Sequence, residues 1–197
     1  MINPRTITDF NRDEAQLQEF LLFCLLVQGK KAEMQAVKLE CFLNFLAHFT
    51  GERMPFKMVN VAMNYELDDE DDSNILFKAA KQFGLGQYGR LCRAVEDFIQ
   101  LPPLTQVTVK QLESCYGMGP KSARFFIVHS RPNQQYAILD VHILRWLRAQ
   151  GVEAPQSTPQ GKKYAEIEKI FLQFVRHSGK SVAEFDLDIW KENAYAR

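Results

Sequence analysis

The fold of this chain is indicated by one short stretch, residues 112–124, which reads LESCYGMGPKSAR. It has the form of a short helix, a Gly-x-Gly turn at 117–119, and a second helix that begins at Pro120. The glycines permit a positive φ and the close approach of another backbone. Free amides at the start of the second helix can bind a phosphate, so the hairpin can grip a nucleic-acid backbone. An ordinary corner between two helices explains the glycines equally well.

Helical periodicity continues on both sides of this stretch, with apolar residues at steps of three and four. Thr108 and Asp140 are suitable N-caps, and Gly29, Gly51 and Gly151 are stop signals. Residues 51–73 are expected to form a connection with one short helix, and glycines at 84, 86 and 89 to interrupt the next helical stretch. No alternating strand pattern and no repeat is found, so we expect an all-α fold. Helices are predicted over about 13–29, 31–49, 74–83, 90–99, 109–116, 120–130, 140–150, 160–177 and 181–194.

The composition is that of a globular protein, with 46% hydrophobic and 24% charged residues among 197. The longest apolar run, 20–27, is far shorter than a membrane span, and the N-terminus does not resemble a secretory signal. We therefore expect an intracellular protein with no membrane partner. The cysteines at 24, 41, 92 and 115 have no Cys-x-x-Cys spacing, which argues against a zinc or iron–sulfur site.

The net charge is zero, but the charges are segregated along the chain. Residues 66–72 hold six of the 24 acids, and we expect them to form a solvated loop. Residues 78–148 hold ten Lys or Arg and four acids. This locally basic middle is compatible with binding phosphates.

Two residues near the hairpin have the properties of catalytic groups. Lys121 is the second residue of the second hairpin helix, where the helix dipole opposes a positive charge, so we expect a lowered pKa and a larger fraction of free amine. A free amine can attack carbon and form a Schiff base. Asp140, in the segment LDVHIL at 139–144, is expected to cap a helix and thereby to be held as a fixed carboxylate.

Together these segments resemble the helix-hairpin-helix DNA glycosylases, whose signature is Gly-x-Gly-x-Lys followed by Val-Asp-x-His. The matching residues are GMGPK at 117–121 and LDVHI at 139–143. Residues 84–86 (GLG) resemble the 8-oxoguanine branch of that superfamily, and residues 186–190 (DLDIW) its compact archaeal-type members. The chain departs from that type in ending at Arg197, where those enzymes tend to end in Lys.

The resemblance implies a bifunctional glycosylase and AP lyase that excises an oxidised purine, above all 8-oxoguanine, from duplex DNA. Lys121 would be the nucleophile and Asp140 its carboxylate partner, with no cofactor and no catalytic metal. Two alternatives stay open: a glycosylase for another oxidised base, and a non-catalytic hairpin module that binds DNA.

We expect two helical lobes, 1–59 with 152–197 and 60–151, with a lesion-binding cleft between them. The protein is expected to act as a monomer on damaged double-stranded DNA in the cytoplasm, nucleoid or nucleus. Trp190 would stack on the extruded base, with packing as the alternative role. Main-chain oxygens of Glu113, Cys115 and Met118 would hold a monovalent cation. The residues expected to contact DNA are Gly117, Met118, Gly119, Ser122 and His142. A capping or structural role for His142 is an equal alternative.

Overall fold

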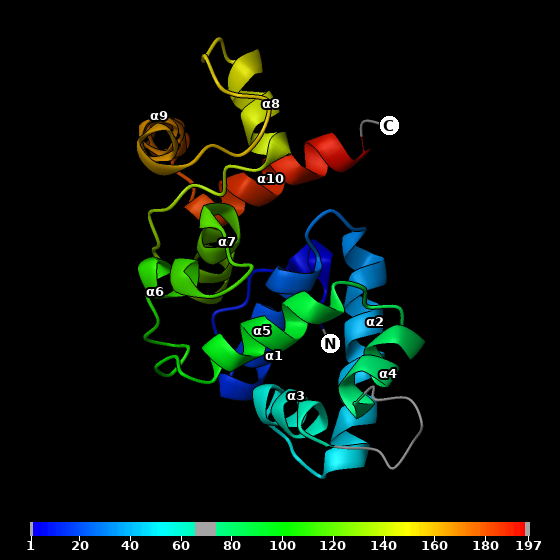
Figure 1. Ribbon diagram of the computed structural model, residues 1–197. Coiled ribbons are helices and arrows are strands. Elements are labelled where there is room, and N and C mark those ends of the chain that lie inside the picture. Colours follow the sequence, from blue (N-terminus) through cyan, green and yellow to red (C-terminus); the bar gives the residue numbers. More distant parts are fainter. Residues whose placement is uncertain (1, 66–73, 196–197) are drawn as a thin grey trace. The chain divides into compact units, whose positions relative to one another are not determined.

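The computed structural model describes residues 2–65 and 74–195, and the expected acidic loop at 66–72 lies outside them. Every regular element of the described residues is a helix (Figure 1), which confirms the all-α prediction. The chain divides into two compact units, Met1–Met118 and Gly119–Arg197. None of the described helices is long and apolar enough to cross a membrane.

The first unit is built around a helix whose second half, 20–26, is buried on all sides. This helix, α1 (Glu14–Leu26), has fully buried side chains at Phe20, Leu21, Leu22, Leu25 and Leu26. A helix that is apolar all round belongs in a core, and three neighbours pack against it: α2 (Ala32–Thr50), α3 (Pro55–Met63) and α5 (Tyr88–Phe98). The unit also contains η1 (Pro4–Thr6), α4 (Ile75–Gln82) and α6 (Val109–Ser114).

Local capping chemistry sets several of the helix ends close to their predicted positions. Asp13 forms a capping box with Gln16 at the start of α1, and Thr108 forms one with Gln111 at the start of α6. Helix α2 ends at Gly51, whose φ is +70°.

The predicted break at Gly89 is wrong, because that residue lies inside α5 and has no positive φ. Gly84 and Gly86, at φ +61° and +63°, make the turn between α4 and α5.

The second unit contains α7 (Pro120–Ser130), α8 (Val141–Ala149), α9 (Gly161–Ser178) and α10 (Val182–Tyr195). Helix α10 packs against the other three. Its buried residues Val182, Ala183 and Ile189 join one apolar core with residues of α7, α8 and α9. Trp146 is partly buried and packs against this core. The centre of its ring lies 5.1 Å from that of Phe174 and 5.3 Å from that of Phe185.

The observed units differ from the expected lobes. The expected grouping placed 1–59 with 152–197, but α1 and α2 pack with α3, α4 and α5 inside the first unit. The reason is that α1 is apolar on every face over 20–26, so it needs neighbours all round there, and α2, α3 and α5 of the same unit supply them. The boundary between the units falls within the hairpin turn, between Met118 and Gly119.

Candidate active site

Lys121 lies in the first turn of α7 and is partly buried. Gly119 precedes this helix in an extended conformation and has no side chain with which to cap the helix start. Pro120 occupies the first turn. The Lys121 Nζ lies 5.1 Å from the centre of the Phe125 ring, one turn further along α7. The ring face attracts a cation, which gives the amine a defined resting position. Ser122 beside it is buried.

Asp140 is fixed at the start of α8 by the cap that the sequence predicts. Its Oδ1 accepts the N–H groups of His142 at 2.8 Å and of Ile143 at 2.9 Å. Two amide bonds to one oxygen fix the carboxylate in position.

The pKa of Asp140 is raised above its usual value. Burial is the largest cause and the negative charge of Asp186 is the second, while the positive charge of Lys121 and the Ile143 amide act in the opposite direction. The structure therefore brings Lys121 and Asp140 into one electrostatic environment within the second unit.

A small polar network holds the segment that leads into Asp140. The buried Tyr164 hydroxyl donates to the carbonyl of Ala137 at 2.7 Å and accepts the N–H of Leu139 at 3.2 Å. Glu168 accepts the N–H of Ala137 at 2.9 Å and pairs with Arg124 Nε at 2.9 Å. These bonds tie residues 137–139 to α9 and α7, so the position of Asp140 is set by the packed core of the unit.

Two further ionisable residues lie in the same environment and were not assigned a role from the sequence. The ring of His129 is fully buried, and its Nε2 lies 3.3 Å from Oδ2 of Asp186 on α10. Asp186 was noted only as part of the motif at 186–190. The sequence nevertheless held a signal of its burial. Asp186 is three or four residues away from Val182, Ala183 and Ile189, so it falls on the apolar face of α10.

The first half of the hairpin turn requires glycine at position 117. Gly117 has a φ of +79°, and a Cβ there would lie 2.9 Å from side-chain carbons of both Arg90 and Leu25. Its carbonyl accepts a hydrogen bond from Nε2 of Gln28 at 3.1 Å. The Met118 side chain is buried, so any DNA contact of this residue has to use its backbone.

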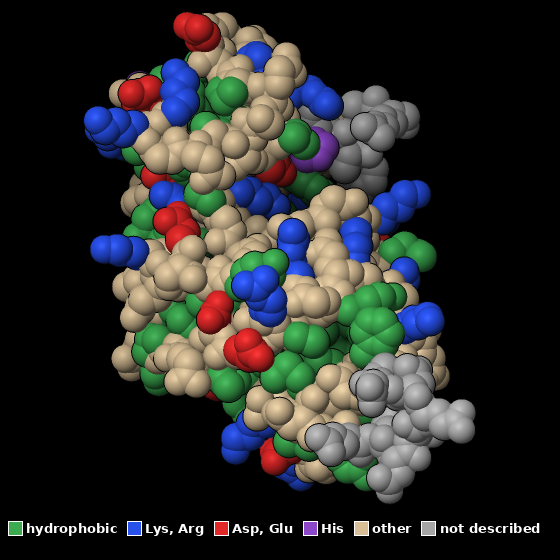
Figure 2. Space-filling model, in the orientation of Figure 1, with side chains coloured by type: hydrophobic (Ala, Val, Ile, Leu, Met, Phe, Trp, Pro, Cys, Tyr) green, Lys and Arg blue, Asp and Glu red, His purple; other side chains and the backbone are tan. Residues whose placement is uncertain are grey.

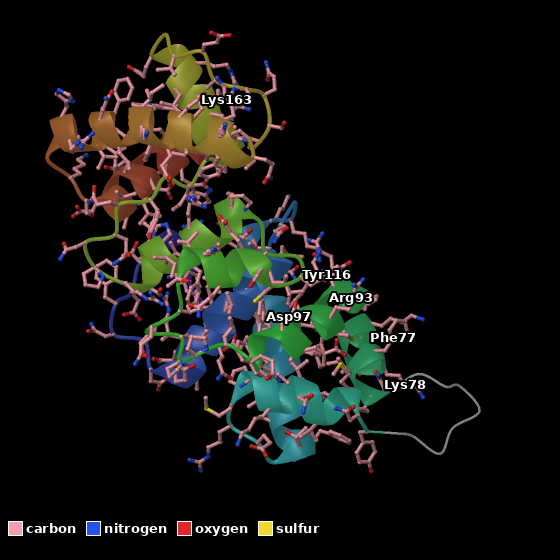
Figure 3. The ribbon with its side chains drawn as sticks, turned by 60° about the vertical axis from the view of Figure 1, so that its left-hand side comes forward. Phe77, Lys78, Arg93, Asp97, Tyr116 and Lys163 are labelled. Atoms are coloured by element: carbon pink, nitrogen blue, oxygen red, sulfur yellow. The ribbon has the colours of Figure 1, made fainter. Side chains whose placement is uncertain are left out.

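Beside the turn, Tyr116 is exposed and held by two residues of α5, which Figure 3 shows close together. Its N–H donates to Oδ2 of Asp97 at 2.6 Å, and the Arg93 guanidinium lies 4.0 Å from its ring centre. On the face seen in Figure 2, Lys and Arg side chains are spread over the surface with hydrophobic side chains between them. Neither Tyr116 nor Arg93 was assigned a role from the sequence.

The remaining expected site residues have more limited support. His142 gives its backbone N–H to Asp140, and its imidazole Nδ1 is buried without a hydrogen-bond partner in the part of the chain that is described. Trp190 is partly buried on α10, and its contact with a base stays a prediction.

The expected main-chain cation site lies at the end of α6. Carbonyl groups in the last turn of a helix have no partner within that helix, which suits them as ligands of a cation. The Cys115 carbonyl accepts the N–H of Met118 at 3.2 Å and keeps a second lone pair. The Cys115 thiol is no candidate ligand at neutral pH, because burial raises its pKa to about 11. The cation and its contacts with Glu113, Cys115 and Met118 stay a prediction.

Comparisons with known proteins identify the family of the chain. A family model described as 8-oxoguanine DNA glycosylase (Ogg-HhH) matches residues 4–180. An 8-oxoguanine DNA glycosylase/AP lyase of Korarchaeum cryptofilum is 25% identical over 193 residues, which cover 96% of this chain and 86% of that protein.

Two crystal structures from Methanocaldococcus jannaschii share the fold. The first, of its 8-oxoguanine DNA glycosylase, has a TM-score of 0.66 at 20% identity and covers 96% of this chain and 83% of that one. The second, of the glycosylase/lyase in complex with 15mer DNA containing 8-oxoguanine, has a TM-score of 0.62 at 19% identity and covers 94% and 84%. Since the family model spans most of the sequence, the chain belongs to the 8-oxoguanine DNA glycosylase family.

Proposed function

We propose that this protein is a bifunctional DNA glycosylase and AP lyase that removes 8-oxoguanine from duplex DNA through a Schiff base at Lys121. The observation that carries the proposal is the placement of Lys121 and Asp140 at the starts of α7 and α8, in one electrostatic environment. An amine and a carboxylate so placed are the two groups that displacement at a sugar carbon needs.

The proposed reaction begins when the free amine of Lys121 attacks C1′ of an extruded nucleotide. The bond from Nζ to C1′ forms as the glycosidic bond breaks, and the departing base takes the bonding electrons and a proton. Positive charge develops on the sugar during this step, and the Asp140 carboxylate stabilises it. Its Oδ1 is engaged by two amides, and the carboxylate carries its negative charge over both oxygens.

Strand cleavage follows from the covalent intermediate. The bond from C1′ to O4′ then breaks, O4′ takes the bonding electrons and the proton that leaves nitrogen, and an imine between Nζ and C1′ remains. Removal of a proton from C2′ then breaks the bond from C3′ to the 3′ phosphate oxygen, which leaves with its electron pair. Water hydrolyses the remaining imine and returns the Lys121 amine.

Recognition of the substrate requires the damaged base to leave the helical stack, because the duplex hides C1′. We propose that the hairpin backbone at 117–119 and the start of α7 bind DNA phosphates, and that the protein acts as a monomer. Trp190 would stack on the extruded base. The name of the Korarchaeum relative and the DNA complex of the Methanocaldococcus protein support 8-oxoguanine as the first substrate to test.

Borohydride trapping tests the covalent step. Incubation with a duplex containing 8-oxoguanine and borohydride should yield a covalent protein–DNA complex, which Lys121→Gln should abolish. Lys163→Gln is a matched control, because Lys163 is an exposed lysine of α9 (Figure 3) that pairs only loosely with Glu166, at 3.6 Å.

The outcomes of this assay separate the alternatives. Trapping that persists in Lys121→Gln would remove Lys121 from the mechanism. Binding without trapping by the unsubstituted protein would favour a non-catalytic DNA-binding module. A panel of duplexes with other oxidised bases would show whether 8-oxoguanine is the preferred lesion.

A further inference from the structure

One face of α5 contacts the residues that lead into the hairpin turn. Arg90, Arg93 and Asp97 are spaced by three and four positions, so they share this face. The Arg90 side chain packs against Gly117, where a Cβ would lie 2.9 Å from two of its carbons. The Arg93 guanidinium lies over the Tyr116 ring, and Asp97 accepts the Tyr116 N–H (Figure 3). All five residues belong to the first unit, so α5 and the start of the turn form one packed structure.

The two arginines of this face differ in their partners. Arg90 is partly buried, and its Nη1 is hydrogen-bonded to Gln28 at 3.0 Å and to Gln87 at 2.9 Å. Arg93 is exposed, and in the described part of the chain its guanidinium contacts the Tyr116 ring and has no hydrogen bond or ion pair. The N–H groups of the Arg93 guanidinium are therefore available to a ligand.

Asp97 does not pair with Arg93, although it lies one turn away on α5. Its Oδ2 accepts the Tyr116 N–H at 2.6 Å, and among the described residues it forms no ion pair with Arg93. This hydrogen bond fixes the Tyr116 backbone, and the Tyr116 ring attracts the guanidinium to a defined place, with 4.0 Å between the guanidinium carbon and the ring centre. Arg93 is thus an exposed cation that is held in position without a carboxylate against it.

A guanidinium held in this way is suited to bind a phosphate. Its planar fork can donate two parallel N–H bonds to phosphate oxygens. The contact with the ring already restricts the side chain, so less conformational freedom is lost when a ligand binds. Tyr116 directly precedes Gly117 of the hairpin turn, whose backbone is proposed to bind DNA phosphates. The free guanidinium therefore lies beside a backbone-binding turn.

We propose that Arg93 binds a backbone phosphate of duplex DNA next to those bound by the hairpin turn, with Tyr116 as the residue that positions it. The inference rests on the proposed function and extends it, because a charged side chain of α5 joins the backbone amides of the turn in holding the duplex. Contacts with phosphates carry no information on the bases, so Arg93 should contribute equally to the binding of damaged and undamaged DNA.

The salt dependence of binding to a short duplex without a lesion tests the proposal, and this assay requires no catalysis. The slope of log K against the logarithm of the salt concentration falls by about 0.9 for each phosphate contact that is lost. Arg93→Gln should therefore bind more weakly and with a slope that is shallower by about this amount. Its deficit in affinity should shrink about 3.5-fold between about 50 and 200 mM salt. An unchanged slope in Arg93→Gln overturns the inference.

Arg53→Gln is the matched control. Arg53 is an exposed arginine of the same unit, in the connection between α2 and α3, which lies away from α6 in Figure 1. Its substitution makes the same change in net charge and should leave the slope as it is. Equal changes of slope in Arg53→Gln and Arg93→Gln would show an effect of overall charge and would refute a specific contact at Arg93.

Tyr116→Leu tests the positioning role of the ring. It keeps the N–H that bonds to Asp97 and leaves the Arg93 charge in place, so the affinity should fall while the slope stays near that of the unsubstituted protein. In the Arg93→Gln background the same substitution should have little further effect. An equal loss in both backgrounds would show that the ring acts independently of Arg93, and the positioning role would be wrong.

The binding assay also separates the inference from the proposed function. A protein that binds the duplex with the expected dependence on Arg93 but gives no borohydride trapping refutes the proposed chemistry and supports the inference. Trapping together with an unchanged slope in Arg93→Gln refutes the inference alone. If Tyr116→Leu does not fold, as judged by circular dichroism, Arg93→Gln and its control decide whether Arg93 contacts a phosphate.

Discussion

Replacement of Gly117 by alanine should destabilise the protein more than any other glycine substitution in the hairpin. Gly117 has a φ of +79°, and a left-handed conformation costs a residue with a Cβ about 1–2 kcal/mol. The new Cβ would also lie 2.9 Å from Leu25 Cδ1 and from two carbons of Arg90. Leu25 is fully buried in α1, and Nη1 of Arg90 is hydrogen-bonded to Gln28 at 3.0 Å and to Gln87 at 2.9 Å.

Neither neighbour can therefore move without loss, and overpacking of this kind costs about 1–3 kcal/mol. The two effects together predict a loss of about 2–5 kcal/mol in the free energy of unfolding of the first unit. This is a large part of the stability of a typical domain, about 5–15 kcal/mol.

Urea unfolding of three variants separates the two effects. Gly119→Ala has neither problem, since Gly119 has an extended conformation and open space at its Cβ position. Gly51→Ala, in the same unit as Gly117, has only the conformational problem, with a φ of +70° and nothing within 4 Å. The expected order of stability is Gly119→Ala, then Gly51→Ala, then Gly117→Ala, and a Gly117→Ala variant as stable as Gly51→Ala would refute the steric reasoning.

Two further substitutions test how Asp140 is held and charged. Asp140→Asn should abolish excision and yet stabilise the free protein at neutral pH, because Asn caps a helix as well as Asp does and brings no charge into the buried site. Folding raises the pKa of Asp140, so the gain in the free energy of unfolding should be present above the raised pKa. The gain should disappear as the pH falls towards about 3.9, where Asp140 of the unfolded chain also becomes protonated. Equal denaturant midpoints of the two proteins at neutral pH would contradict this prediction. Tyr164→Phe should cost about 2 kcal/mol, because it leaves two buried backbone groups of residues 137–139 without their partner. It should also slow single-turnover excision through misplacement of Asp140, and unchanged rates would show that the network does not position the carboxylate.

Features that depend on neighbouring residues in the chain could be predicted from the sequence. The Asp140 cap, the Thr108 cap and the stop at Gly51 each involve backbone groups within a few residues. The start of α7 at Pro120 follows from the chemistry of proline in the same way. For that reason local sequence patterns are enough to place the two proposed catalytic residues at helix starts.

Features that depend on tertiary packing could not be placed in this way. Gly89 looked like a third break, and only the positive φ of Gly84 and Gly86 shows where the turn lies. The two compact units differ from the expected lobes, because the division follows from which helices cover the apolar second half of α1. The pairing of His129 with Asp186 joins residues 57 positions apart, and no local pattern specifies such a contact.

The opposing influences on Asp140 suit it to the proposed chemistry. In the free protein its negative charge is favoured by two backbone amides and Lys121 and disfavoured by burial and Asp186. In the proposed reaction the amine of Lys121 attacks in its neutral form, so the carboxylate has no cationic partner there until positive charge develops on the sugar. The interaction between Asp140 and the substrate is therefore strongest in the transition state, and catalysis requires that difference. A carboxylate in open solvent would be screened in both states and would gain little from the change.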